Sequence, residues 1–339
     1  MPLSLRHQLR SLASRVPSRN YAAVSSSPSQ TNPYTVGPYQ VFDRNAKRLQ
    51  RDRAVARDGG DRSRTVDYIR DEIAERMMER FMDIKRARDL ATFSKLLESD
   101  KAKKTVMLEM SGKTLHREPD SEFEATSTGQ DIVQVERIQG DEENLLQHIE
   151  RESQEAVLSC LSLHWNPSHR LTDEAGVLVQ IRESLKPDGL FLGAMFGGDT
   201  LFELRTSLQL AEAEREGGLS PHVSPMTDTR DISNLLGRAG FTLLTVDTDE
   251  VKVGYPSMWE LMEDLQDMGE SNAVIGRRAR ISPDTLAAAS AIYKELHGNE
   301  DGSIPATFQV IYMIGWKPAD SQPKPLERGS GKVNLKEVL

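Results

Sequence analysis

Ionisable and aromatic side chains follow apolar segments of strand length at several places in this sequence. One such segment, Lys104–Met110, carries an acid near its end, Glu109, and another, Ala156–Leu163, leads into His164 and Trp165. Histidine can give or take a proton near neutral pH, and tryptophan can stack on a flat group. Ligands of open parallel sheets bind beyond the carboxyl ends of the strands. We therefore treat His164 and Trp165 as candidates for facing a substrate; the alternative is a packed aromatic beside a hydrogen-bonded histidine.

A loop with two glycines, Gly197–Thr200, follows a second apolar segment, Leu190–Phe196. Its backbone N–H groups could be exposed to a ligand, and Asp199 could cap the helix that begins at Thr200. Together with Arg205, Asp199 could instead contact a guanidinium or carboxylate group of a substrate. We favour the capping role for Asp199 and keep both residues as candidates for the substrate face.

The two apolar segments flank an amphipathic helix. Ala156–Leu163 and Leu190–Phe196 are nearly continuous in apolar and small residues, as expected for strands that are covered on both faces. Pro187 stops the helix, and Asp188 and Gly189 supply turn chemistry before the second strand. A helix between two such strands is a crossover, which places the strands parallel in one sheet.

The rest of the sequence alternates between helix and strand patterns. The charged segment Val41–Arg64 is interpreted as a loop or a surface helix. This order predicts an α/β fold with a doubly wound, mostly parallel sheet that is closed by a late antiparallel pair. Helices are predicted at 66–84, 91–98, 201–217, 228–239, 258–265 and 282–297, and further strands at 104–110, 132–138, 241–246, 250–253 and 308–316.

Composition argues against several classes of protein. The net charge of −9 is unlike that of a general nucleic-acid binder, which would carry a basic face. No apolar run approaches the roughly 18 residues of a membrane span, so we expect no transmembrane segment. The single cysteine, Cys160, is predicted to be a small side chain in a buried strand. The histidines are scattered and show no pattern of a two-histidine iron site, so we predict no metal site.

The first 40 residues differ from the rest of the chain. They contain no Asp or Glu, carry Arg6, Arg10, Arg15 and Arg19, and are rich in serine. An acid-free, arginine-rich amphipathic start is typical of a mitochondrial transit peptide. We predict a transit peptide and linker over 1–40, a main domain over 41–317 with a helical extension at 65–85, and a polar tail over 318–339.

Three stretches of the main domain together resemble a known superfamily. They are LSLHW at 161–165, LKPDGLFLGAMFGGDTLFELR at 185–205 and YPSMWELMEDLQDMGESNA at 255–273. They resemble the class I S-adenosylmethionine-dependent methyltransferases, and within these the group of mitochondrial complex I assembly factors described as arginine hydroxylases. The likeness extends over about 159–316. It implies a Rossmann-like, methyltransferase-like domain, S-adenosyl-L-methionine as cofactor, and an arginine of a complex I subunit as the modified group.

The resemblance also implies roles for particular residues. Glu109 matches the acid that binds the ribose hydroxyls of the cofactor, since a carboxylate can accept hydrogen bonds from two neighbouring hydroxyls. Asp141 matches the acid near the adenine amino group, with Glu142 assisting it. Ser162 and His164 match the loop beside the methionine end of the cofactor.

One part of the superfamily pattern is missing from this sequence. The pattern has a strand and a loop of the form Leu-Asp-x-Gly-x-Gly-x-Gly between the helix that ends near Lys85 and the helix near Phe93. This chain has only Arg86–Thr92 in that interval, without a glycine. Glycines there let the backbone approach the cofactor closely. We therefore predict a methyltransferase fold that lacks its first strand and glycine-rich loop.

Three functions stay open at this point. The first is a complex I assembly factor in the mitochondrial matrix that modifies an arginine by hydroxylation or methylation. The second is a non-catalytic assembly chaperone, and the third is a small-molecule or carrier-protein methyltransferase. The resemblance leaves open whether the chain is an enzyme and whether it associates peripherally with the inner membrane. We expect no nucleic acid among its partners.

Overall fold

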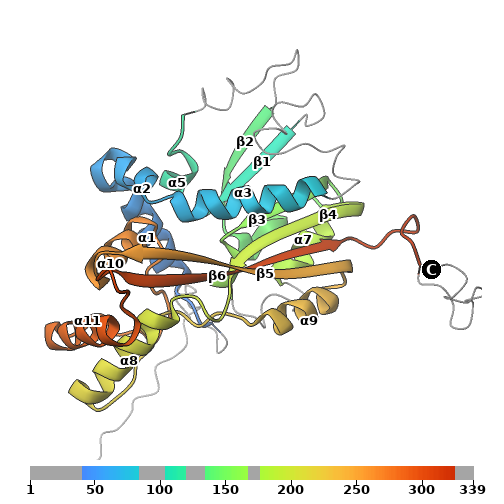
Figure 1. Cartoon of the computed structure of the whole chain (residues 1–339). Helices are drawn as coiled ribbons and strands as arrows, with labels where there is room; N and C mark the ends of the chain where they lie inside the picture. The colour runs from blue at the N-terminus through green and yellow to red at the C-terminus, as the bar shows by residue number, and fades with distance from the viewer. Residues whose placement is uncertain (1–39, 84–103, 120–133, 167–175, 325–339) are drawn as a thin grey trace, which may run out of the picture. The chain divides into compact units, whose positions relative to one another are not determined.

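The computed structural model describes residues 40–83, 104–119, 134–166 and 176–324 (Figure 1). All of these belong to one compact unit, Gln40–Leu339. The predicted transit peptide up to residue 39, the predicted helix at 91–98 and the interval Arg86–Thr92 lie outside the described residues.

A four-stranded sheet forms the larger part of the fold, in the order β3-β4-β6-β5. Its strands are β3 (Gln154–Cys160), β4 (Leu185–Phe196), β5 (Thr242–Tyr255) and β6 (Ile304–Trp316). β3 and β4 run parallel and are connected through helix α7 (Val177–Ser184), so the predicted crossover is confirmed. β6 pairs antiparallel with both β4 and β5, which confirms the late antiparallel closure.

Two strands form a separate parallel sheet, β1 (Lys104–Glu109) with β2 (Gln134–Gln139). The α/β class and the parallel pairing are confirmed, and the described strands form two sheets rather than one. The division lies between β1 and β3. None of the described strands pairs with both edges, so the described parts of the two sheets are not joined into one ladder.

Several strand boundaries differ from the prediction. β3 ends at Cys160, because Leu161 adopts a left-handed backbone conformation with φ of 52°. β4 begins at Leu185 rather than Leu190, because backbone hydrogen bonds between Asp188, Gly189 and Lys317 extend its pairing.

The two short strands predicted at 241–246 and 250–253 are one continuous strand, β5. Its central residues pair throughout with β6, from Asp247 opposite Tyr312 to Glu250 opposite Gln309. Acidic side chains between the two predicted strands find cations on helix α3 (Tyr68–Asp83): Arg76 bonds to Asp249 at 2.7 Å. The partner strand and helix therefore stabilise an extended conformation that local composition disfavours.

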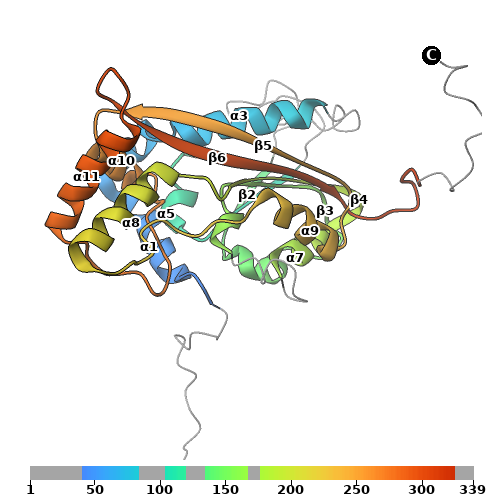
Figure 2. The ribbon, with the colours of Figure 1, turned by 60° about the horizontal axis from the view of Figure 1, so that its bottom comes forward.

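The side chains of β4 alternate between two hydrophobic clusters. Leu192 and Ala194 pack with the buried face of α3, while Phe191 and Met195 pack with α7 and helix α9 (Thr229–Ala239). Helices therefore cover both faces of the four-stranded sheet, as Figure 2 shows for α3 and for α7 with α9. The remaining predicted helices are confirmed as α8 (Phe202–Glu216), α10 (Met258–Asp267) and α11 (Pro283–His297).

The charged segment Val41–Arg64 is not a loop or a surface helix. It forms α1 (Arg44–Ala56), the short 3₁₀ helix η1 (Arg57–Gly60) and α2 (Asp61–Thr65). Four side chains of α1 are buried, and three of them carry a positive charge: Arg44, Lys47, Arg51 and Ala54. In the part of the chain that the structure describes, no helix combines the length and the apolar character that crossing a membrane requires.

Candidate functional site

Helix α1 directs three cations to one buried side. Arg44, Lys47 and Arg51 are spaced three and four residues apart, so they share a face of the helix. They are only 8%, 0% and 6% exposed. The helix is fixed at its start, where the Asp43 side chain accepts from the Ala46 N–H and the Asp43 N–H donates to the Ala273 carbonyl. Buried cations need anionic or hydrogen-bonding partners, and all three have them.

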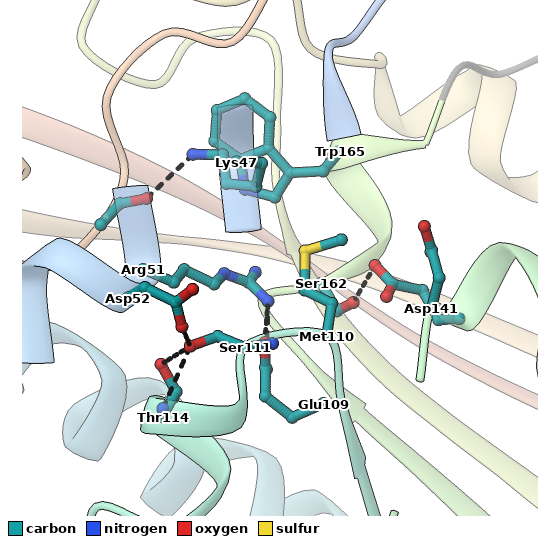
Figure 3. Close-up of polar contacts among 12 residues, drawn as sticks. Lys47, Arg51, Asp52, Glu109, Met110, Ser111, Thr114, Asp141, Ser162 and Trp165 are labelled. Atoms are coloured by element: carbon teal, nitrogen blue, oxygen red, sulfur yellow. Dashed lines mark hydrogen bonds and ion pairs between the residues drawn. The ribbon is translucent and has the colours of Figure 1, made fainter. Parts of the chain in front are cut away.

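Arg51 binds the acid at the end of β1. Its Nη1 donates to both carboxylate oxygens of Glu109, at 2.9 and 3.1 Å (Figure 3). The N–H of Ser111 donates to the same carboxylate at 3.0 Å. Burial disfavours the charged form of Arg51, but Glu109 and Glu270 outweigh burial and raise the pKa of the guanidinium. Arg51 and Glu109 therefore form a charged pair in the folded protein.

Arg44 binds the two acids that follow β2. Its Nη2 lies 2.7 Å from Asp141 and 2.6 Å from Glu142. Burial opposes ionisation of Glu142, but the charges of Arg44 and Arg51 outweigh it and lower the pKa of that carboxyl. The hydroxyl of Ser162 donates to Glu142 at 2.8 Å, which connects the end of β3 to the same group. The carboxyl ends of β1, β2 and β3 therefore meet beneath α1.

Lys47 lies between the two arginines and is completely buried. Its Nζ donates to the carbonyl oxygens of Gly269 and Ser271, at 2.9 and 3.0 Å. The same atom lies 3.2 Å from the centre of the Trp165 ring, a cation–π contact (Figure 3). Complete burial lowers the pKa of Lys47, and the nearby charge of Glu270 opposes that shift.

Glu270 is the acid that joins the tryptophan and histidine to this site. Its Oε2 accepts from the Trp165 Nε1 at 2.9 Å and lies 3.5 Å from Nε2 of His164. Burial favours the neutral acid, but Lys47, His164 and Arg51 together lower the pKa of Glu270. Burial lowers the pKa of His164, so its neutral form is favoured near pH 7.

A hydroxyl network attaches α1 to the segment that follows β1. The Ser111 hydroxyl donates to Asp52 at 2.7 Å and accepts from the Thr114 N–H at 3.1 Å (Figure 3). Ser111 also caps the short helix α5 (Gly112–Leu115). These contacts and the two arginine–carboxylate pairs hold α1 over the carboxyl ends of the strands.

The four residues predicted to bind cofactor lie together in this structure. Glu109, Asp141, Glu142 and Ser162 all surround the ends of β1, β2 and β3, and sequence reasoning placed them correctly on neighbouring strands. Their acceptor oxygens, however, are engaged by protein donors: Glu109 by Arg51 and a backbone N–H, and Asp141 by Arg44 and the N–H of Glu143. A ribose would need the same oxygens. The residues in this arrangement therefore do not fit S-adenosyl-L-methionine.

The four substrate-face candidates separate into two places. His164 and Trp165 are buried beside Glu270 and Lys47, and Trp165 lines one wall of a cavity of about 380 Å³. Asp199 and Arg205 bond elsewhere: Asp199 accepts from Gln309 Nε2 at 3.1 Å. Arg205 donates to the carbonyls of two residues in the preceding loop, at 2.9 Å each. We therefore find no single surface that all four candidates share.

The predicted capping role of Asp199 is wrong. Helix α8 begins at Phe202, and the N-cap residue Leu201 before it has a left-handed φ of 53° and makes no side-chain capping hydrogen bond. The loop is instead fixed by β6, because the Leu201 N–H donates to the Thr307 carbonyl and the Thr200 hydroxyl to the Gln309 carbonyl.

Cys160 also differs from its prediction. The side chain is exposed rather than part of a buried core. It lies at the end of β3, whose outer edge has no strand beside it among the described residues. Protein atoms crowded around the sulfur still disfavour the thiolate and raise the pKa of the thiol to about 11.

Sequence reasoning missed the cations of α1 and the acid Glu270. The available signal was the spacing of Arg44, Lys47 and Arg51 at three and four residues, which indicates one helix face. A charged helix face is usually exposed to water, so the spacing alone did not indicate that these side chains are buried. Within the described ranges, no group of three His, Cys, Asp or Glu side chains is placed to hold a metal ion.

Comparisons with known proteins give close relatives of this chain. No family model matches the sequence. The human protein arginine-hydroxylase NDUFAF5, mitochondrial, is 43% identical over 339 residues, which cover 97% of this chain and 92% of the relative. The zebrafish (Danio rerio) protein of the same name is 45% identical over 306 residues, covering 88% and 89%. A solved candidate methyltransferase from Bacillus halodurans aligns with a TM-score of 0.41 at 19% identity, over 64% of this chain and 84% of that one.

Proposed function

We propose that this chain, which belongs to the NDUFAF5 family of mitochondrial arginine-hydroxylases, is an assembly factor of respiratory complex I that acts on an arginine of a complex I subunit. The observation that carries the proposal is the identity of 43–45% along most of both relatives. We place the protein in the mitochondrial matrix, in agreement with the arginine-rich first 40 residues. A fusion of residues 1–40 to a reporter should enter mitochondria, and cytosolic retention would contradict this placement.

The geometry of the site supports arginine as the group that is recognised. Asp141 and Glu142 hold the guanidinium of Arg44, and Glu109 holds that of Arg51. Planar guanidinium groups suit paired carboxylate acceptors, so a substrate arginine could take the place of Arg44 or Arg51 and keep the charge balanced, which the neutral hydroxyls of a ribose could not do.

Of hydroxylation and methylation, we favour hydroxylation, in which one atom of dioxygen is inserted into a C–H bond and an external two-electron donor reduces the other atom to water. The two relatives carry that activity in their names. Methylation would draw its methyl group from S-adenosyl-L-methionine, whose ribose would compete with Arg44 and Arg51 for the same carboxylates. A methyltransferase acting on small molecules or carrier proteins is disfavoured for the same reason. The relatives named for carrier-protein methylation match only about half of this chain, at 33% identity over 178 residues in one case.

A second candidate function is to hold the client without modifying it. The specific observation in its favour is that the predicted cofactor acids are already paired with α1. A chain in this state would serve assembly as a chaperone that binds an arginine-bearing segment.

Re-expression of the chain in cells that lack it tests both candidates. Native electrophoresis would report assembled complex I, and mass spectrometry would report the mass of each arginine in its subunits. We expect restored assembly together with the gain of one oxygen on an arginine. Restored assembly without modification would favour the holding function, a gain of a methyl group would overturn the choice of hydroxylation, and failure to restore assembly would overturn the proposal.

Calorimetric titration with S-adenosyl-L-methionine tests the disagreement with the cofactor. We expect no heat of binding up to millimolar cofactor in the full chain. Micromolar binding would show that α1 can leave the carboxylates and would contradict our interpretation of the site. A variant with Arg44→Ala and Arg51→Ala serves as a control, since it frees the acceptors without supplying the missing glycine loop.

A further inference from the structure

Two strand edges face each other across the division between the two sheets. β1 pairs with β2 and β3 pairs with β4, but no strand joins β1 to β3 among the residues that the structure describes. A cavity of about 230 Å³ lies between them and is lined from both strands, by Val106 and Leu108 of β1 and by Val157 and Leu158 of β3. These apolar side chains are only half-buried, whereas their counterparts in β4 are fully buried. The gap is therefore lined by the kind of apolar side chains that would contact a strand lying between β1 and β3.

The backbone of β3 has hydrogen-bonding groups directed into this gap. The Leu161 N–H donates to the Ala194 carbonyl of β4 at 2.8 Å. Successive backbone groups of a strand point to opposite sides, so the N–H groups of Leu158 and Cys160 face away from β4. Those of Val157 and Ser159 face β4 and pair with it.

The backbone of β1 is arranged in the same way. The Glu109 carbonyl accepts from the Gly140 N–H on the β2 side, at 3.1 Å. By the same alternation, the backbone groups of Val106 and Leu108 face the gap. An extended segment that entered would find hydrogen-bonding partners on both sides, as in donor-strand complementation.

One end of the gap is acidic. Glu109 and Glu142 line the cavity where β1 and β3 end. Asp141 and Glu142 share the guanidinium of Arg44, and Glu109 pairs with Arg51, so three carboxylates here lie against two guanidinium groups of α1. A further guanidinium would balance this charge, and the contacts of Arg44 show that such a group fits the acceptors.

We infer that the gap between β1 and β3 binds an extended, largely apolar segment of the client protein, which pairs with both strands and brings an arginine to Glu109 and Glu142. The inference rests on the proposed function, because that function supplies the arginine-bearing client. It adds the conformation of the bound segment and the place where it binds. The apolar lining selects the body of the segment, and the acidic end selects its arginine.

Amide hydrogen exchange on the full chain tests the pairing. The probe is a synthetic octapeptide of alternating valine and threonine that ends in arginine. We expect the peptide to slow exchange at the amides of Leu158 and Cys160. The amides of Val157 and Ser159 are an internal control, because they already pair with β4 and should not change. A peptide with alternate backbone N–H groups methylated should give no protection, since it cannot complete the ladder.

Cys160 provides an independent readout. It is the single cysteine of the chain, and its exposed side chain lies on β3 beside the gap. At peptide concentrations about ten times the Kd, only about one-tenth of the protein is free, so alkylation of Cys160 should slow about tenfold. Replacing the peptide's arginine with citrulline, which removes the charge at nearly constant shape, should weaken this protection. Equal protection by the citrulline peptide would overturn the role of the acidic end.

Three results would overturn the inference. The first is protection of Leu158 and Cys160 in the free monomer, which would mean that the chain fills its own gap. The second is protection that grows with protein concentration as dimers form, which would assign the gap to a second copy. The third is peptide binding without protection of these amides. Failure of the proposed function is separate, because it would appear as lost complex I assembly in cells while the peptide still protected β3.

Discussion

The two sheets of this protein differ in what holds their strands in place. In β4, every residue from Leu190 to Phe196 is buried, because β3 and β6 flank the strand and helices cover both faces. In β1, the residues from Thr105 to Glu109 are only half-buried. Two-stranded sheets are marginal by themselves, and this one is attached by the buried charges of α1. Among the described residues, the flanked strands are therefore stabilised mainly by apolar packing, and the two-stranded sheet is stabilised in large part by ion pairs with α1.

Truncating one leucine in each sheet should give the largest difference in stability between the two sheets. Leu192 of β4 is completely buried, so Leu192→Ala should lower the free energy of unfolding by about 2–5 kcal/mol, through lost contacts and a cavity. Leu108→Ala in half-buried β1 should cost about 1 kcal/mol. Denaturant unfolding measures both. Equal losses would contradict the difference in packing.

Removing a buried cation should affect the two-stranded side specifically. Arg44→Met leaves Asp141 and Glu142 without their guanidinium, and we expect a loss of about 3 kcal/mol. The matched control is Arg48→Met on the same helix, whose partner Asp52 is at an i,i+4 surface spacing, with a cost below about 1 kcal/mol. Hydrogen exchange should become faster in β1 and β2 and stay unchanged in β6. Faster exchange in both sheets alike would show that α1 does not act locally.

Lowering the pH should destabilise the folded protein through His164, which lies near the junction of the two sheets. Its folded-state pKa is below the ordinary value of 6.5, because burial disfavours the imidazolium. Below pH 6.5, His164 is protonated in the unfolded chain but stays neutral in the folded chain. The free energy of unfolding therefore falls as the pH falls. The slope from this group approaches about 1.4 kcal/mol per pH unit. His164→Asn should remove that slope in unfolding titrations between pH 7 and pH 5.5, and an unchanged slope would refute the assignment.

The outer edge of the four-stranded sheet should be the least sensitive. Arg76 pairs with Asp249 of β5 at 2.7 Å, but their side chains are 27% and 40% exposed. Solvent screens such pairs, so Arg76→Ala should cost about 0.5 kcal/mol, and less at high salt. A loss as large as that of Arg44→Met would remove the distinction between surface and buried charge on which the comparison depends.

Much of the larger sheet could be predicted because its signals are local. The continuous apolar segments of β3 and β4, the amphipathic spacing of α3 and the Ser-Pro start of α11 are each readable within one element. Glu109, Asp141, Glu142 and Ser162 were likewise found at strand ends. Failures occurred where a distant partner overrides local preference, as in the long strand β5, whose acidic centre is extended only because β6 and α3 lie beside it.

By itself, the sequence determined the α/β class, the parallel crossover from β3 to β4, and which acids end the strands. Periodicity and strand composition set these features within short windows, so no distant contact was needed. Only the tertiary structure showed that the described strands form two sheets, separated between β1 and β3. It also showed that the cationic face of α1 packs against the acids at the strand ends. The physical reason is separation along the chain: Arg51 meets Glu109 across 58 positions and Arg44 meets Asp141 across 97. A charged helix looks the same in sequence whether water or carboxylates surround it, and only folding determines which.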